Sequence, residues 1–272
     1  MANILEKIVA QTSDDLKKRK KEISFNDLHS LEGFEKERIS FKARLQKEGV
    51  SVIAEVKKGS PSKGTIREDF NPLDIALSYE DGGASAISVL TDKPFFMGDL
   101  EYLSAISKRV QLPLLRKDFI IDPFQIKEAR AYGADAVLII VAITEGNQLS
   151  ELLAAAKEFD LDALVECYDQ DDFDRIDFNE VDILGVNNRD LRYFNVDVHR
   201  GTSILKQAPE GTVLVSESGI STGEDIALLK RNNIDSVLIG EHFMRQSNPG
   251  QAVKDLLEQG EEAYERSMKD GL

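Results

Sequence analysis

Eight short apolar segments recur at regular intervals from residue 51 onwards, and they constrain the fold more than any other feature of the chain. These segments are Ser51–Val56, Ala84–Leu90, Leu112–Leu115, Ala136–Val141, Ala163–Cys167, Ile183–Val186, Thr212–Val215 and Ser236–Ile239. Each is nearly continuous in apolar character, which is typical of parallel strands covered on both faces. The pattern therefore predicts eight buried parallel strands.

Amphipathic segments at helical spacing separate these strands. They are Pro72–Glu80, Gly98–Arg109, Pro123–Tyr132, Asn147–Phe159, Gln170–Ile176, Val198–Gln207, Ser221–Arg231 and Pro249–Tyr264. Regular alternation of strands and helices predicts βαβ units and a parallel sheet. Eight units in 272 residues favour closure into an α/β, (β/α)₈ TIM barrel over an open doubly wound sheet.

Residues 1–48 lie outside this repeat and are highly charged. Apolar residues at helical spacing predict two helices there, the first from Ile4, Leu5, Ile8 and Val9 and the second from Phe34, Ile39, Phe41 and Leu45. We therefore expect residues 1–48 to be an N-terminal helical extension packed on the barrel. Residues 49–272 are expected to form the barrel as one catalytic domain.

The formal net charge of −15 disfavours nucleic acid and anionic membranes as partners. The basic run from Lys17 to Lys21 is interpreted as a solvated helix face, because the surrounding chain is acidic. No signal peptide is recognisable, and the longest apolar run, Ala136–Ile143, has the length of a strand. The single cysteine, Cys167, excludes an internal disulfide and favours a reducing compartment, so a cytoplasmic location is expected.

Polar residues gather where the predicted strands end, which is where (β/α)₈ barrels carry their active sites. They are Glu55 and Lys57; Arg116, Lys117 and Asp118; Glu166; Asn187, Asn188, Arg189 and Asp190; Ser216, Glu217, Ser218 and Gly219; and Gly240 and Glu241. Glutamates inside apolar strands are costly to bury without partners, so each could simply pair with a nearby lysine. Their convergence from several strands favours a functional site instead.

Two features point to an anionic, phosphorylated small molecule. Gly219 and Gly240 follow the seventh and eighth strands, where barrels frequently bind phosphate through backbone N–H groups. The segment Lys57–Gly64 supplies three lysines to an acidic chain and is interpreted as a loop that closes over the substrate, with an ordinary solvent loop as the alternative.

Metal and cofactor sites are not predicted. His29, His199 and His242 lie far apart, and no carboxylate or cysteine stands at metal-ligand spacing from them. Cys167 has no evident histidine base and is interpreted as a buried structural thiol. The chain has neither a dinucleotide-binding nor a Walker glycine motif.

Several longer segments resemble the indole-3-glycerol phosphate synthase family. They are Ile53–Gly64, Ser88–Leu103, Leu112–Ile126, Leu164–Asp169, Gly185–Leu191 and Val215–Ile220. The resemblance covers the barrel from about Val50 to Leu257 and includes the N-terminal extension. It implies conversion of 1-(2-carboxyphenylamino)-1-deoxyribulose 5-phosphate to indole-3-glycerol phosphate, CO₂ and water, without a metal or organic cofactor.

The resemblance also implies roles for individual residues. Lys117 matches the general acid of the family, Glu55 and Glu166 match its catalytic carboxylates, and the other implied site residues are Lys57, Asn187, Ser60, Arg189, Ser218, Gly219, Gly240 and Glu241. Glu241 departs from the serine that many members carry, so a side-chain hydroxyl contact to the phosphate would be lost.

Two other functions stay open on the sequence. One is a Schiff-base aldolase-like barrel with Lys117 as nucleophile, and the other is a non-catalytic barrel that binds a phosphorylated metabolite. Nothing in the sequence determines the oligomeric state, and a monomer is the working expectation.

Overall fold

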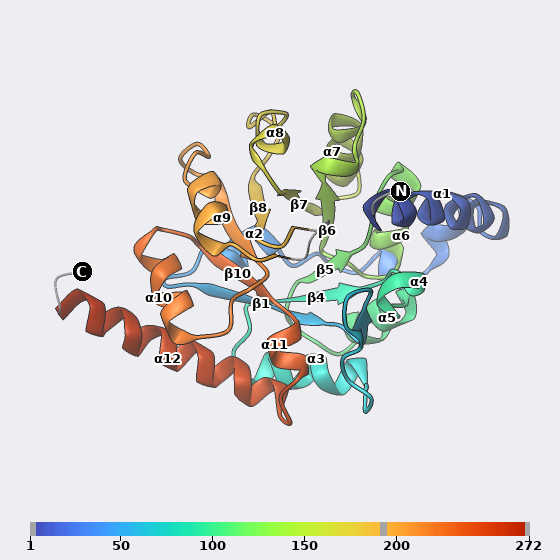
Figure 1. Cartoon of the computed structure of the whole chain (residues 1–272). Coiled ribbons are helices and arrows are strands. Elements are labelled where there is room, and N and C mark those ends of the chain that lie inside the picture. The colour runs from blue at the N-terminus through green and yellow to red at the C-terminus, as the bar shows by residue number, and fades with distance from the viewer. Residues whose placement is uncertain (1–3, 191–194, 270–272) are drawn as a thin grey trace.

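The computed structural model describes residues 4–190 and 195–269. Within these residues, eight parallel strands close into a barrel in the order β1-β10-β9-β8-β7-β6-β5-β4 (Figure 1). The strands are β1 (Ser51–Val56), β4 (Ala86–Leu90), β5 (Leu114–Lys117), β6 (Ala136–Ile140), β7 (Asp162–Cys167), β8 (Ile183–Asn187), β9 (Val213–Glu217) and β10 (Ser236–Ile239). The predicted barrel is confirmed.

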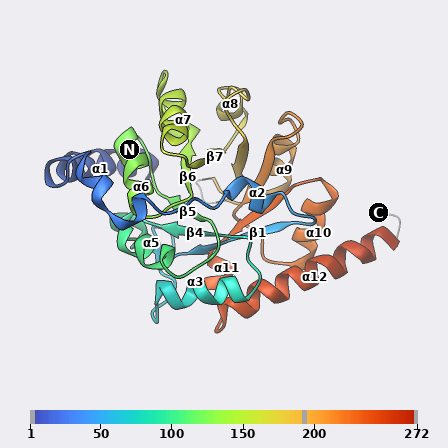
Figure 2. The same cartoon turned by 180° about the vertical axis from the view of Figure 1, so that it is seen from behind.

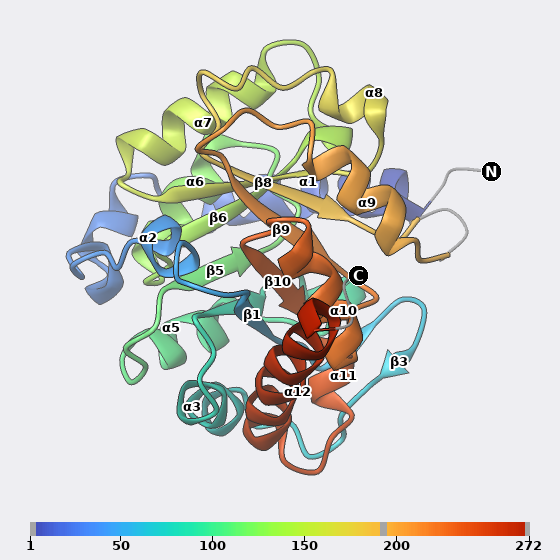
Figure 3. The same cartoon turned by 90° about the vertical axis from the view of Figure 1, so that its left-hand side faces the viewer.

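Helices surround the strands (Figure 3). They are α3 (Pro72–Asp81), α4 (Lys93–Phe96), α5 (Leu100–Ser107), α6 (Pro123–Ala131), α7 (Gln148–Glu158), α8 (Gln170–Phe173), α9 (Val198–Leu205), α10 (Gly223–Arg231), α11 (Glu241–Met244) and α12 (Pro249–Lys269), with the 3₁₀ turn η3 (Val141–Ile143) after β6. None of the helices in the described ranges is long and apolar enough to cross a membrane.

Local sequence signals explain where several helices begin. Asn71 precedes Pro72 and its side chain accepts hydrogen bonds from the first turn of α3. Asp122 stands in the same relation to Pro123 at the start of α6. At α10, Thr222 and Asp225 satisfy each other's backbone N–H groups in a capping box.

Several predicted boundaries were wrong. The third and seventh strands end later than expected, because β5 continues through Lys117 and β9 continues through Glu217. The helix predicted over Gly98–Arg109 is shorter, since α5 covers Leu100–Ser107, and the short helix α4 before it was not predicted. The loop after β1 contains a short antiparallel pair, β2 (Gly59–Ser60) and β3 (Gly64–Thr65). Leu191, the last residue of the segment Gly185–Leu191, lies outside the described residues.

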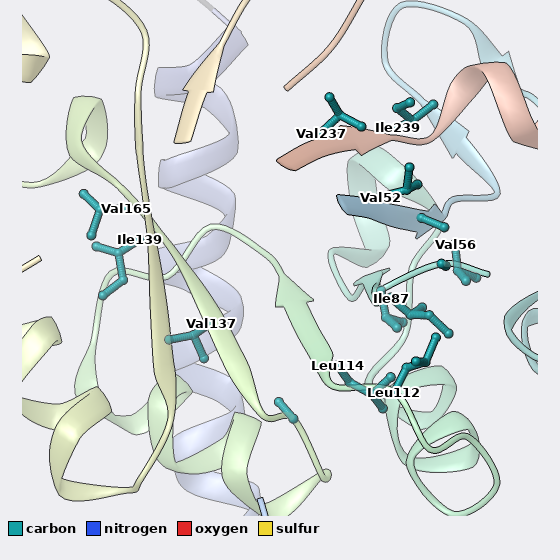
Figure 4. Packing of buried hydrophobic residues seen from close by; sticks show 14 of the residues in the cluster. Val52, Val56, Ile87, Leu112, Leu114, Val137, Ile139, Val165, Val237 and Ile239 are labelled. Carbon is teal, nitrogen blue, oxygen red and sulfur yellow. The ribbon is translucent and has the colours of Figure 1, made fainter. Parts of the chain in front are cut away.

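Side chains alternate between two apolar layers along each strand, as the pleat requires. In β1, Val52 and Val56 belong to the layer between strands and helices, whereas Ile53 points into the barrel. Figure 4 shows part of the outer layer, including Val137, Ile139 and Val165. Charged residues that follow the inward alternation therefore face the interior of the barrel mouth.

The chain before β1 forms α1 (Ile4–Glu22), the 3₁₀ turns η1 (Asp27–Ser30) and η2 (Glu32–Phe34), and α2 (Phe41–Leu45). The second predicted helix is shorter than expected, because Phe34 instead packs with Leu28 and Leu16 against Phe124 of α6. Figure 2 shows α1 beside α6. The Lys127 ammonium of α6 also lies 3.6 Å from the centroid of the Phe25 ring, a cation–π contact to the extension.

Most of the basic run in α1 is exposed, as interpreted from the sequence. Arg19 is the exception, because it is half-buried and pairs with Glu128 of α6 at 3.2 Å, and Lys20 pairs with Asp122 just before α6. Lys17 forms an ion pair with Asp14 and Lys18 forms one with Asp15, each at 3.1 Å. These pairs connect residues three apart on the same helix, so they neutralise part of the basic charge locally.

Candidate active site

A pocket of about 430 Å³ opens at the carboxyl ends of the barrel strands. Its lining includes the eleven residues to which the resemblance gives a role, namely Glu55, Lys57, Ser60, Lys117, Glu166, Asn187, Arg189, Ser218, Gly219, Gly240 and Glu241. These residues come from the first, third, fifth, sixth, seventh and eighth barrel strands or from the segments that follow them. The fold thus brings together in one pocket all the residues to which the resemblance gives a role. Of the other polar residues predicted at the strand ends, Asp118 and Glu217 line the pocket, whereas Arg116, Asn188, Asp190 and Ser216 do not.

Lys117 is held between two carboxylates. Its Nζ atom lies 2.9 Å from an Oε atom of Glu166 and 2.9 Å from one of Glu217. Burial alone would lower the pKa of Lys117, but the charges of Glu166, Glu217 and Glu55 outweigh burial and raise the pKa well above its ordinary value. Lys117 is therefore an ammonium ion in the lining of the pocket, where it donates to both Glu166 and Glu217.

The neighbouring Arg116 fixes the direction of Lys117. Arg116 is fully buried on the outer side of β5. Its guanidinium lies 2.9 Å from the carboxylate of Asp118 and 2.9 Å from that of Glu128, which belongs to α6. It also donates to the carbonyl of Gln125. Since successive side chains of a strand point to opposite faces, locking Arg116 outward directs Lys117 into the barrel.

Glu217 is a central residue of the site, although the sequence predicts only that it lies at the end of a strand and assigns it no role. Burial raises the pKa of Glu217 to about 8; Lys117 opposes this effect and Glu166 adds to it. A signal was present in the sequence: Val213 and Val215 point into the barrel, and Glu217 continues their two-residue alternation. The apolar pattern alone ends the predicted strand at Val215, which places Glu217 in the following loop.

Glu55 and Lys57 form a second ion pair at the mouth of the barrel, with 2.5 Å between carboxylate and ammonium. Gly240 makes room for this pair, because a Cβ atom there would lie 2.1 Å from the Glu55 carboxylate. Asn187 ends β8 nearby, and its side-chain oxygen accepts a hydrogen bond from the backbone N–H of Arg189.

The turn after β9 has an unusual backbone. Ser218 and Gly219 have φ values of 71° and 80°, which is a strained conformation for Ser218. Asn188 holds the turn by donating from its side chain to the Ser218 carbonyl and to the Ser216 hydroxyl. The turn lines the pocket together with Gly240 and the start of α11, and the strands that precede them, β9 and β10, are neighbours in the barrel.

The opposite wall of the pocket is apolar. Ile4 and Ile8 of α1 contribute to this wall together with Phe96, Phe119, Leu138 and Ile140. The spacing of Ile4 and Ile8 in the sequence predicts only that they pack the extension. Their place in the pocket depends on how α1 docks on the barrel, and no local pattern reveals that.

No group of three or more His, Cys, Asp or Glu side chains suited to a metal ion occurs within residues 4–190 and 195–269. Cys167 is buried with a free thiol, and burial raises its pKa well above the ordinary value. An unreactive structural thiol fits this environment.

Comparison with known proteins identifies the family. The sequence model described as indole-3-glycerol phosphate synthase matches residues 5–256. The chain belongs to the indole-3-glycerol phosphate synthase family. A relative of that name from Zymomonas mobilis subsp. pomaceae is 47% identical over 94% of this chain and 99% of its own. One from Salinibacter ruber is 46% identical over 95% of this chain and 96% of its own.

Solved structures that resemble this indole-3-glycerol phosphate synthase family member support the fold. A mutant tryptophan synthase alpha-subunit from Pyrococcus furiosus superposes with a TM-score of 0.57 at 15% identity, covering 78% of this chain and 97% of the other. A 3-hexulose-6-phosphate synthase superposes with a TM-score of 0.61 at 12% identity, covering 77% of this chain and 99% of the other. At such identities the likeness concerns the barrel alone.

Within this family member, Gly185 of β8 makes room for Glu217. A Cβ atom at Gly185 would lie 2.4 Å from the second carboxylate oxygen of Glu217. We expect Gly185→Ala to fold normally, since the flexible carboxylate can move, and to lower kcat by at least about tenfold because Glu217 leaves Lys117. Steady-state kinetics and a circular-dichroism melting curve measure the two effects.

A double-mutant cycle controls for unrelated disturbance by the added methyl group. In a Glu217→Gln background, the further change Gly185→Ala should cost much less kcat than it does alone, because both substitutions act on one side chain. Fully additive effects would contradict this account of Gly185.

Proposed function

We propose that this chain catalyses the indole-3-glycerol phosphate synthase reaction, converting 1-(2-carboxyphenylamino)-1-deoxyribulose 5-phosphate to indole-3-glycerol phosphate, CO₂ and water. Family membership supports the proposal over nearly the whole chain. The observation that carries the proposal is the Lys117 ammonium, which is held between Glu166 and Glu217. An apolar wall and a glycine-containing turn line the same pocket.

The proposed first step is ring closure with Lys117 as general acid. The aromatic carbon attacks the substrate ketone, and Lys117 donates a proton to the oxygen on which negative charge develops. Loss of CO₂ then restores the aromatic ring. A lysine whose pKa is raised by neighbouring carboxylates stays protonated until the substrate oxygen takes the proton.

Dehydration then needs an acid for the leaving hydroxyl and a base for a carbon-bound proton. Glu166 and Glu55, with Lys57 as a further acid, are proposed for these two roles, and Asn187 for orienting the substrate between them. Every step is a proton transfer or a rearrangement of bonds within the substrate. The proposed chemistry therefore uses no metal or organic cofactor.

The two ends of the substrate differ in chemistry, and so do the two ends of the pocket. We assign the aromatic ring to the apolar wall that includes Ile8 and Phe119. We assign the phosphate to the backbone N–H groups around Gly219 and Gly240, with Ser60 and Ser218 as side-chain donors. Arg189 supplies a positive charge for the anionic substrate.

The Schiff-base alternative is less well supported. A lysine that attacks a carbonyl needs a neutral amine, which enzymes obtain by lowering its pKa. The carboxylates around Lys117 do the opposite. Borohydride trapping with a ketose phosphate separates the two mechanisms, and we expect no covalent adduct on Lys117.

The direct test is turnover of the carboxyphenylamino substrate by the purified protein, followed through the fluorescence of the indole product. Indole fluorescence that rises in proportion to enzyme concentration is expected. Binding of the substrate without any product would contradict the proposal and favour a non-catalytic metabolite-binding barrel.

Three properties complete the proposal. We propose that residues 1–48 serve as an extension of a single catalytic barrel formed by residues 49–272, since the extension packs on α6 and supplies Ile4 and Ile8 to the pocket. A cytoplasmic location is proposed from the composition, with its single cysteine. A monomer is the expected oligomeric state, which light scattering measures.

A further inference from the structure

The side chain of Glu241 stands at the end of the pocket where the phosphate is proposed to bind. Glu241 begins α11 directly after Gly240. Its carboxylate faces three cations from different parts of the chain, namely Lys63 of the β2–β3 loop, Arg189 after β8, and Arg245 one turn further along. All four residues line the pocket.

The contacts of Glu241 are of two kinds. Arg245 donates two hydrogen bonds to one carboxylate oxygen, at 3.1 and 3.0 Å. Lys63 and Arg189 lie farther away, at 3.8 and 3.7 Å from the carboxylate, beyond hydrogen-bonding distance. The side chain is thus anchored on Arg245, and its contacts to the other two cations are loose enough to be exchanged.

Glu241 is ionised in this environment. Partial burial would raise its pKa, but the hydrogen bond from Arg245 and the charges of Lys63, Arg245 and Arg189 outweigh burial and lower the pKa. A carboxylate and a phosphate that approach the same cations repel each other, so the two anions compete for Lys63 and Arg189.

We propose that the Glu241 carboxylate is a built-in substitute for the substrate phosphate, which holds Lys63 and Arg189 in place in the free enzyme and releases them when the phosphate arrives. This inference rests on the proposed function and deepens it. Glu241 becomes a specificity-determining residue that lowers the affinity for phosphate, so that inorganic phosphate alone binds weakly and the phosphorylated product leaves readily.

The test replaces Glu241 by glutamine and uses inorganic phosphate as the probe. Glu241→Gln keeps the size of the side chain and removes its charge. We expect the dissociation constant for phosphate, measured by calorimetry without substrate, to fall about fivefold, as removal of one nearby negative charge in a partly exposed site predicts. The inhibition constant of phosphate against turnover should fall by the same factor.

Two further variants sharpen the test. Glu258→Gln removes the same charge from an exposed position on α12, and it should leave phosphate binding unchanged, which controls for the net charge of the chain. Glu241→Ser removes the charge with a different side chain and should also strengthen phosphate binding. Melting curves verify that each variant is folded. If Glu241→Gln does not fold, phosphate binding by Glu241→Ser tests the inference.

Equal or weaker phosphate binding in folded Glu241→Gln or Glu241→Ser would overturn the inference. An equal gain in Glu258→Gln would overturn it as well, because a general charge effect would then account for the result. Failure of the proposed function is distinguishable, since it would appear as absence of turnover in the unaltered enzyme, whatever the variants do to phosphate binding.

Discussion

Replacing Lys117 by alanine should lower kcat by about 10³-fold or more while the barrel still folds. The size follows from losing both a general acid and the charge that stabilises the developing oxyanion. KM should change much less, because the apolar wall and the proposed phosphate end of the pocket stay intact. Single-turnover measurements of indole formation, in which product release does not interfere, give the effect on the chemical steps.

The control variant for this prediction is Lys108→Ala. Lys108 is an exposed lysine that pairs with Glu32 on the extension, outside the pocket, so its removal should leave kcat unchanged. Near-normal kcat in Lys117→Ala would remove Lys117 from the proposed mechanism. A melting curve is needed alongside, since Lys117→Ala removes the cation that both Glu166 and Glu217 contact inside the barrel.

Replacing Glu217 by glutamine should lower kcat by about 10²-fold above pH 8 and change the pH dependence of the reaction. With a pKa of about 8, Glu217 is mostly protonated at pH 7 and ionises as the pH rises further. Only the ionised form supplies the negative charge that holds the Lys117 ammonium, so kcat/KM of the unaltered enzyme should rise through about pH 8. Glutamine does not titrate, so the variant should lack this rise.

The stability of the protein supplies an independent readout of the same group. A carboxyl whose pKa is raised on folding stabilises the folded state fully below its ordinary pKa of 4.5, and this contribution is lost as the pH rises through about 8. The free energy of unfolding of Glu217→Gln should therefore fall less between these pH values than that of the unaltered protein. An unchanged pH dependence of both activity and stability would contradict the raised pKa.

The barrel was predictable because its signal repeats. Each strand and helix is short, but eight alternating apolar and amphipathic segments permit few architectures. Strand ends were harder, since Lys117 and Glu217 look like loop residues when read locally. In the barrel both lie in strands, and Lys117 contacts Glu166 and Glu217, which come from two other strands.

The candidate site was predictable to the extent that it follows the ends of strands. All eleven predicted residues reach one pocket for that reason. Glu217 could have been found by extending the alternation of Val213 and Val215. Ile4 and Ile8 could not, because the contact between α1 and the barrel mouth is set by packing between segments far apart in the sequence.

Closure of the barrel through β1 and β10 has a consequence for synthesis of the protein. Ser51 of β1 pairs with Ser236 of β10, so the ring closes only when most of the chain exists. Until β10 leaves the ribosome, β1 and β9 each keep an open strand edge that can pair with other chains. Truncated translation products that end before residue 236 should therefore be inactive and prone to aggregate, and cells have reason to remove them quickly.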